Sequence, residues 1–259
     1  MNLPVHFYPD ARLKLLCIAC EVLARPLYWS ASQSPHQVDV RLVEKGQHNH
    51  PACLRGQLQE QIHAASSAGY DAVVLGYGLC GRATAGLVAV GIPLVIPRAH
   101  DCITLFLGSR QRYLVEFARC PGTFWYSRDY MERQAAGDST AALGLGSAGE
   151  IQAEYDRFVE KYGRENADYL VEVMGAWAQH YQRAVFLASG LGDDSQAQEE
   201  ARRQADRWGW MFEMLAMDLS LLHRLLAGDW DADFLVLKPG ESILETHDES
   251  ILKSSGWQE

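Results

Sequence analysis

The sequence has no excess of basic residues and no long uninterrupted apolar run. Lysine and arginine together number 23, against 33 aspartate and glutamate residues, and the formal net charge is −10 with a pI near 5.4. This charge gives no electrostatic reason to expect nucleic acid or an anionic membrane as a partner. No stretch approaches the roughly 20 apolar residues of a membrane-spanning helix. The N-terminus lacks the basic flank and apolar core of a signal peptide, so we expect a cytoplasmic protein with neither nucleic acid nor membrane as a partner.

Cysteine is sparse, with six residues in a chain of 259. In a reducing compartment such cysteines are more typical of metal ligands, reactive thiols or small buried side chains than of a disulfide framework. Apolar residues make up 48% of the chain and charged residues 22%, which argues against extended disorder. The length is sufficient for one α/β domain with a helical appendage.

Short apolar stretches alternate with segments of helical spacing. Strands are predicted over residues 13–19, 38–44, 70–75, 93–97 and 234–237, with a further short strand within 120–127. Helices are predicted over residues 21–30, 52–68, 84–90 and 103–117. The aliphatic runs are continuous, as expected for parallel strands covered by helices on both faces. The sequence therefore predicts an α/β fold with a Rossmann-like, mostly parallel sheet and a helical insertion before the last strand.

Three segments follow from this pattern. Residues 1–134 are expected to form the Rossmann-like core with a cysteine and histidine site. Residues 135–228 are expected to form a helical insertion or lid, entered through an Ala-, Gly- and Ser-rich connection and strongly helical over 150–188 and 195–226. Residues 229–259 are expected to return the last strand to the core and to end in a C-terminal tail.

The apolar runs of the core end in residues that can bind a metal or take part in catalysis. One run ends at Cys20, a second at Cys80 between glycines, and a third at His100 and Cys102. Because the carboxyl ends of parallel strands lie along one edge, where ligands bind, we expect these four residues to converge. Glycines around the second thiol allow close backbone approach or positive φ, which suits cofactor binding. Candidate cofactor-binding residues are therefore Gly76, Gly78 and Gly81, together with Arg110 as a cation for an anionic group.

A zinc site is the favoured interpretation of the thiols and imidazole. Zinc binds soft thiolates and imidazole in a tetrahedral array, and a catalytic site keeps one position open. Cys80, His100 and Cys102 supply three ligands, and Cys20 is either a fourth ligand or a nucleophile. Glu21 and Asp101 adjoin these residues, where each could orient a ligand, act as a general base or cap the following helix. We thus expect catalytic roles for Cys20, Glu21 and Asp101.

Three other interpretations remain open. An iron–sulfur cluster could use Cys17, Cys20, Cys80 and Cys102, but Cys17 and Cys20 should point to opposite faces of an extended strand, which makes Cys17 a core residue. Without a metal, Cys20 and Cys80 could act as an acid and base pair of the racemase kind, or one thiol could act as a hydrolytic nucleophile. The thiols could also simply be buried small side chains.

Several segments of the chain resemble the domain of unknown function 1638 family. They are Cys-Ile-Ala-Cys-Glu at 17–21, His-Asn-His-Pro at 48–51, Gly-Tyr-Gly-Leu-Cys at 76–80, His-Asp-Cys at 100–102, Gly-Ser-Arg at 108–110, Pro-Gly-Thr-Phe-Trp-Tyr at 121–126, Lys-Tyr-Gly-Arg-Glu-Asn-Ala at 161–167 and Phe-Leu-Val-Leu-Lys-Pro-Gly-Glu at 234–241. The resemblance implies a microbial protein associated with corrinoid-dependent methyl transfer, and it assigns no catalytic residue. The His-x-Cys pair with a distant cysteine is also similar to that of zinc methyltransferases of the uroporphyrinogen-decarboxylase type, whose barrel the rest of the chain does not resemble.

The expected function is therefore that of a metal-dependent, zinc-using transferase. It would activate a small thiol or hydroxyl substrate for group transfer, with methyl transfer in one-carbon or corrinoid metabolism as the most concrete form. A corrinoid protein or a methyltransferase is the expected partner besides the small-molecule substrate. The alternative of a different class is a carrier that binds an iron–sulfur cluster or a corrinoid for another enzyme.

Overall fold

The computed structural model describes residues 12–45, 47, 50–133, 159–160, 163–164 and 181–256. The chain divides into two compact units. The first unit comprises Met1–Leu114 and Met217–Glu259, and the second comprises Val115–Ala216. These limits differ from the predicted boundaries at 134 and 228, because the chain leaves the first unit within a helix and rejoins it before the last helix of the chain.

The first unit contains a five-stranded sheet with the order β2-β1-β3-β4-β8. Its strands are β1 (Lys14–Cys20), β2 (Gln37–Val43), β3 (Ala72–Gly76), β4 (Leu94–Pro97) and β8 (Phe234–Leu237). The first four run parallel, and β8 pairs antiparallel with β4. The predicted α/β class with a mostly parallel, Rossmann-like sheet is confirmed.

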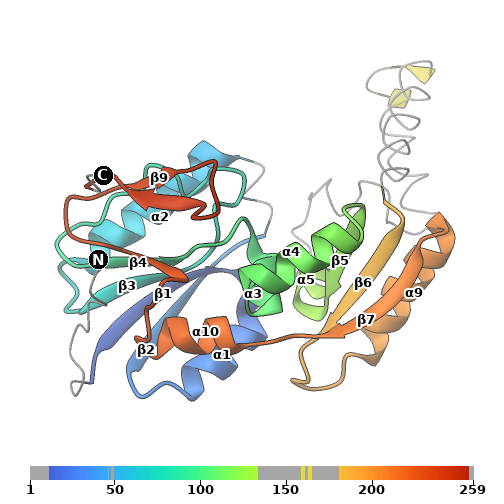
Figure 1. Cartoon of the computed structure of the whole chain (residues 1–259), viewed down its shortest axis with the longest axis horizontal. Helices are drawn as coiled ribbons and strands as arrows, with labels where there is room; N and C mark the ends of the chain where they lie inside the picture. The colour runs from blue at the N-terminus through green and yellow to red at the C-terminus, as the bar shows by residue number, and fades with distance from the viewer. Residues whose placement is uncertain are drawn as a thin grey trace. The chain divides into compact units, whose positions relative to one another are not determined.

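Both faces of this sheet are covered. The short helix η1 (Glu21–Leu23) leads into α1 (Ala24–Ser32), which packs with α10 (Ser220–Leu226) on one face. The other face carries α2 (Pro51–Ala65) and the hairpin of β9 (Ile243–Glu245) and β10 (Leu252–Ser254), as Figure 1 shows. On that face Leu16, Ile18 and Leu75 of the sheet pack with Leu54 and Leu58 of α2. The central strands β3 and β4 are buried along their whole length, as expected for parallel strands covered on both faces.

Two helix predictions in the first unit are wrong. Residues 84–90 form turns and one bridge instead of a helix, because Gly86 has a φ of +86° and the amides of Gly86 and Ala89 donate to the carbonyl oxygens of Ile243 and Glu241. The predicted helix 103–117 is divided into α3 (Cys102–Leu107) and α4 (Arg110–Arg119). The break is at Gly108, with a φ of +76°, where an added Cβ would lie 2.5 Å from the carboxyl carbon of Asp218.

The second unit contains a parallel three-stranded sheet with the order β5-β6-β7. Its elements are β5 (Thr123–Ser127), α5 (Arg128–Glu132), β6 (Arg183–Ala188), α9 (Ser195–Trp208) and β7 (Met211–Ala216). The prediction of helix through 188 and over 195–226 is therefore wrong at β6 and β7. One face of this sheet packs its aromatic residues against Ala201 and Ala205 of α9. Among the described residues, no helix is both long enough and apolar enough to cross a bilayer.

Candidate functional site

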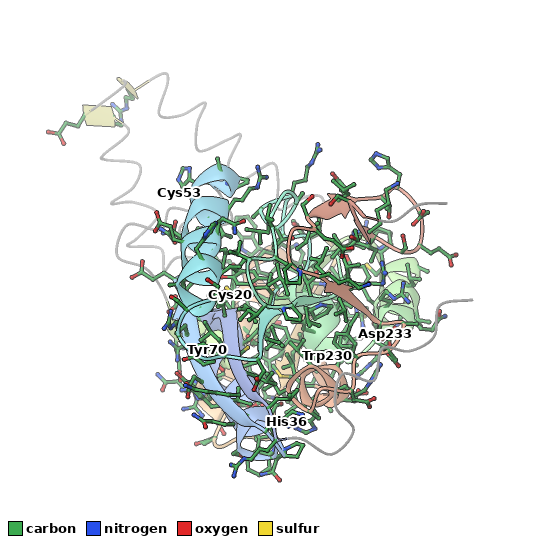
Figure 2. The ribbon with its side chains drawn as sticks, turned by 90° about the vertical axis from the view of Figure 1, so that its left-hand side faces the viewer. Cys20, His36, Cys53, Tyr70, Trp230 and Asp233 are labelled. Atoms are coloured by element: carbon green, nitrogen blue, oxygen red, sulfur yellow. The ribbon has the colours of Figure 1, made fainter. Side chains whose placement is uncertain are left out.

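The order of strands in the first unit creates a position where the chain reverses direction across the sheet. After β1 the chain passes to β2 on one side, and then to β3 on the other side of β1. The crevice beyond the carboxyl ends of β1 and β3 is thus a topological switch point, where ligands bind in open α/β sheets. Cys20 ends β1, and Cys80 lies in the loop that follows β3. Figure 2 shows Cys20 at this end of the sheet and His36, which precedes β2, at the opposite end.

Two loops are joined at this edge by their main chains. The amide of Leu79 donates to the carbonyl of Ala99, and the amide of Cys80 donates to the carbonyl of His100, both at 2.8 Å. The loops meet at Gly78, where an added Cβ would lie 2.6 Å from the Ala99 carbonyl oxygen. These contacts fix the loop after β3, with Cys80, against the loop after β4, with His100 and Cys102.

Packing requires glycine at position 76, whereas backbone conformation favours glycine at position 81. At Gly76 an added Cβ would lie 2.5 Å from the Cβ of Ala19, so this glycine lets β1 and β3 approach each other. Gly81 has a φ of +61°, and its neighbours Cys80 and Arg82 have φ values of +46° and +71°. The amide of Ala83 donates to the Cys80 carbonyl at 3.2 Å, which closes a turn with two central residues of positive φ. Non-glycine residues with this backbone are strained, and such strain is concentrated at functional sites.

The thiols of this edge lie close enough to influence one another. Burial raises the pKa of Cys80 to about 12, and the nearby Asp101 and Cys20 add to the increase. Burial also raises the pKa of Cys102 well above its ordinary value, with further contributions from Asp101, Cys80 and Cys20. Cys20, Cys80 and Cys102 therefore lie within electrostatic range of one another, and their convergence with His100 on a common metal stays a prediction. In the absence of a cation, Cys80 and Cys102 are neutral at pH 7.

Two tyrosines join these thiols, and the sequence interpretation missed both. Tyr77 is buried, and its pKa is raised by burial and by the neighbouring Cys20, Cys80 and Cys102. Burial, Asp101 and Cys102 raise the pKa of Tyr113, on α4, to about 12. Both phenols are therefore protonated at neutral pH and are able to donate hydrogen bonds. Tyr77 could have been found from its position inside the glycine loop, whereas nothing in the sequence marks Tyr113.

His100 and Asp101 take different positions from those of the thiols. His100 is exposed, and its ring centroid lies 6.4 Å from that of Tyr113. Asp101 caps α3 by accepting from the amides of Ile103 and Thr104. Burial raises the pKa of Asp101, although these two hydrogen bonds and His100 act in the opposite direction. Of the roles considered for Asp101, the structure shows the helix cap, which also fixes the start of α3 at Cys102.

A buried cation at the end of β2 was also missed. Lys45 is only 5% exposed, and its amide donates to Oε1 of Glu21 at 2.8 Å. Glu21 thus joins the end of β1 to the end of β2. The position of Lys45 directly after a predicted strand was the available signal, because a lysine is seldom buried at an ordinary strand end.

The other cysteines lie away from this group. Cys17 is fully buried in β1 and its pKa is raised to about 12 by burial, consistent with the predicted core position. Cys53 is exposed on α2, as Figure 2 shows, and Cys120 belongs to the second unit. His48, in a segment used for the family resemblance, lies outside the described residues.

The thiols fit a soft metal ion by their chemistry, since thiolates are preferred ligands of zinc. Within the part of the chain that the structure describes, no group of three or more histidine, cysteine, aspartate and glutamate side chains is arranged so that it could hold a metal ion.

Comparisons with known proteins identify the family of the chain and nothing more specific. The family model described as protein of unknown function (DUF1638) matches residues 42–226. This range includes the loops that carry Cys80, His100 and Cys102, whereas Cys20 precedes it. No curated protein and no solved structure matches the chain significantly.

Proposed function

The chain belongs to the DUF1638 family of proteins of unknown function, and we propose that it is a metal-dependent group-transfer enzyme whose site lies at the switch point of the first unit. One observation carries this proposal: Cys20, Cys80 and Cys102 come from separate strand ends and lie within electrostatic range of one another. Partly buried thiols near a ligand-binding edge of a sheet are suited to a soft cation.

Zinc is the proposed metal, with Cys20, Cys80 and Cys102 as ligands and His100 as the candidate fourth. The raised pKa values of Cys80 and Cys102 mean that a cation is needed to hold these thiols as thiolates at neutral pH. When bound, zinc supplies a Lewis acid that favours the anionic form of a substrate thiol or hydroxyl.

The chain's own residues then position the reacting groups. Tyr77 and Tyr113 keep their protons at neutral pH, so each can donate a hydrogen bond to a substrate oxygen or sulfur. Asp101 holds the first turn of α3 and so fixes Cys102. The transferred group in our proposal is a methyl group, passed to or from a corrinoid partner protein. This finer part of the proposal rests only on the association with methyl transfer that the sequence resemblance implies.

Elemental analysis of protein purified without oxygen tests the metal. We expect about one zinc per chain and no visible colour, because zinc has a filled d shell. Iron with sulfide and a brown absorption would instead support the iron–sulfur interpretation. Cys20→Ala, Cys80→Ala and Cys102→Ala should each lower the zinc content, and Cys53→Ala, on the exposed face of α2, is the matched control.

The zinc content of the His100→Ala variant tests whether His100 is the fourth ligand. A loss of zinc in this variant, with an unchanged circular dichroism spectrum, would add the exposed imidazole to the ligand set. Full zinc content would remove His100 from it. Retention of zinc by all three cysteine variants would show that the proposed metal site is wrong.

A metal-free reaction is the second candidate. It is favoured by the neutral state of the Cys80 thiol and by the position of Cys20 and Cys80 after the adjacent parallel strands β1 and β3. In this case Cys20 and Cys80, on the two sides of the switch point, would exchange protons with a substrate. Solvent deuterium uptake into a candidate substrate by chelator-treated protein, lost in Cys20→Ser and in Cys80→Ser, would support this reaction over the zinc mechanism.

A further inference from the structure

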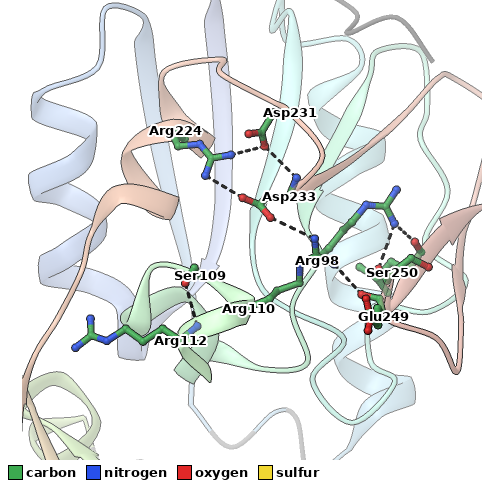
Figure 3. A network of polar contacts seen from close by, with 10 residues as sticks. Arg98, Ser109, Arg110, Arg112, Arg224, Asp231, Asp233, Glu249 and Ser250 are labelled. Atoms are coloured by element: carbon green, nitrogen blue, oxygen red, sulfur yellow. Dashed lines mark hydrogen bonds and ion pairs between the residues drawn. The ribbon is translucent and has the colours of Figure 1, made fainter. Parts of the chain in front are cut away.

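Two arginines beside the site hold a strained turn. Arg98 directly follows β4, and Arg110 begins α4. Nη1 of Arg98 donates to the carbonyl oxygens of Ser250 and Leu252, and Nη1 of Arg110 donates to that of Glu249 at 2.7 Å. Figure 3 shows both guanidinium groups directed toward this turn between β9 and β10.

The turn itself has an unfavourable backbone. Ile251 has a φ of +62°, and the amide of Leu252 donates to the Ser250 carbonyl at 2.6 Å, across one residue. A positive φ is a genuine outlier for a β-branched residue, and this type of γ-turn is rare. The turn is therefore held by its surroundings, namely the burial of Ile251 and the two guanidinium groups.

The charge of Arg98 lacks a close counter-ion. In the described part of the chain, its guanidinium contacts main-chain carbonyls only, through Nη1, and no carboxylate lies within ion-pairing distance. Burial and the nearby Arg110 both lower the pKa of Arg98, and the more distant Asp248 only partly offsets them. A partly buried cation beside a second cation, with donors still available, is the arrangement that attracts an anion.

The neighbouring carboxylates are engaged elsewhere. Oδ1 of Asp233 lies 3.3 Å from Arg110, but Oδ2 of the same residue binds Arg224 at 3.0 Å, and Arg224 also binds Asp231. Arg110 thus shares a carboxylate with another arginine and is only partly neutralised by it.

We propose that Arg98 and Arg110 form a binding site for an anionic group, a carboxylate or a phosphate. The anion takes the donors of Arg98 that no protein group uses and replaces the carbonyls of Ser250 and Leu252 on Nη1. Occupancy therefore loosens the strained turn at Ile251. This site stands on its own contacts and does not depend on the thiol chemistry proposed above.

Isothermal titration calorimetry with inorganic phosphate, and separately with succinate, tests the site. We expect at least one of the two to bind, and we expect Arg98→Gln and Arg110→Gln each to weaken that binding about tenfold or more, as the loss of a charge-assisted hydrogen bond predicts. Arg82→Gln is the matched control, since Arg82 is exposed and already paired with Glu245 at 2.8 Å. Binding of neither anion, or equal binding by the Arg98 and Arg82 variants, would overturn the proposal.

Hydrogen exchange of the unaltered protein gives a test that needs no variant. The amides of Ile251 and Leu252 should exchange faster when the anion is bound, because their turn is released. The amide of Ser255, which donates to the Ser242 carbonyl outside the turn, serves as the internal reference. Slower exchange at Ile251 on anion binding would contradict the replacement of the carbonyls.

Discussion

The thiols of Cys80 and Cys53 differ in their exposure to solvent, although both cysteines belong to the first unit. Cys53 is exposed on a helix, whereas burial beside Asp101 and Cys20 raises the pKa of Cys80 to about 12. Buried Cys17 has a similarly raised pKa. An unfolded thiol ionises near pH 8.5, so the folded state holds these protons to higher pH than the unfolded state does.

The stability of the metal-free protein should therefore depend on alkaline pH. The contribution of a raised thiol pKa is fully present below the pKa of the unfolded state, near 8.5, and is lost as pH rises toward the folded value, about 12. Between these limits each such thiol lowers the free energy of unfolding by up to ~1.4 kcal/mol per pH unit. Urea denaturation under reducing conditions at pH 8 and at pH 10 measures this loss.

Cys80→Ala should show a shallower pH dependence than the unaltered protein, because one of the shifted groups is removed. Cys53→Ala should follow the unaltered protein. Equal pH dependence of the Cys80 and Cys53 variants would mean that the Cys80 thiol ionises normally in the folded state.

Arg82 allows the backbone strain next to Cys80 to be measured. Its φ is +71°, a conformation that costs an L-residue roughly 1–2 kcal/mol and glycine nearly nothing. Arg82→Gly should therefore be about 1 kcal/mol more stable than Arg82→Ala in chemical denaturation, the reverse of the usual order. Both variants lose the exposed ion pair with Glu245, so this loss cancels in the comparison. A less stable glycine variant would contradict the strain.

The sequence predicts the thiols of the site better than it predicts their neighbours. Strand ends are readable from apolar runs, and parallel strands bring their ends together, which places Cys20, Cys80 and Cys102 at one edge. His100 was expected to join the thiols, but its side chain is exposed, and nothing in the sequence pattern distinguishes it from the buried residues around it. The position of Tyr113 depends on the break at Gly108, which sets the direction of α4 and is not visible as a spacing in the sequence.

At the scale of elements, a buried ion-pair network joins α4 to the sheet of the second unit. Arg183, the first residue of β6, is fully buried, and its guanidinium contacts Glu116 of α4 at 2.7 Å and Glu213 of β7 at 2.6 Å. Arg119 binds Glu213 from the exposed side. Burial would raise the pKa of Glu213, but Arg183 and Arg119 outweigh this effect and lower it.

Loss of the central arginine should weaken the second unit. Arg183→Met removes the buried cation that contacts Glu116 and Glu213 and leaves only the exposed Arg119 beside them. Breaking a buried pair in this way costs about 3–5 kcal/mol. Arg119→Met removes an exposed partner of the same carboxylate and should cost less than about 1 kcal/mol. Urea denaturation at pH 7 gives both values, and equal losses would show that burial of Arg183 is unimportant.

The strands of the second unit escape prediction for a physical reason. Residues 183–188 read Arg-Ala-Val-Phe-Leu-Ala, a short apolar run of the kind that periodicity alone cannot assign to helix or strand. In β7 the residues Met211, Glu213 and Met214 have high or moderate helix propensity, and only pairing with β6 makes them a strand. Tertiary pairing thus overrides the local preference, whereas the β-branched runs of β3 and β4 agree with their structure.

For the molecule as a whole, metal binding at the thiols should be linked to the release of protons. Cys80 and Cys102 are neutral at pH 7.5, and a thiol must lose its proton to bind zinc. Zinc binding to Cys80 and Cys102 should therefore release about two protons from these two thiols. The apparent zinc affinity should therefore rise with pH.

The number of protons released distinguishes the ligand sets. We expect Cys102→Ala to reduce the release by about one proton per zinc, because one thiol that must ionise is removed. Calorimetric titration of apoprotein with zinc in buffers of different ionisation enthalpy measures this number. Cys53→Ala is the suitable control, because this exposed thiol lies outside the proposed ligand set. Zinc binding without proton release would mean that Cys80 and Cys102 are not ligands, because a thiol binds zinc only after it has lost its proton.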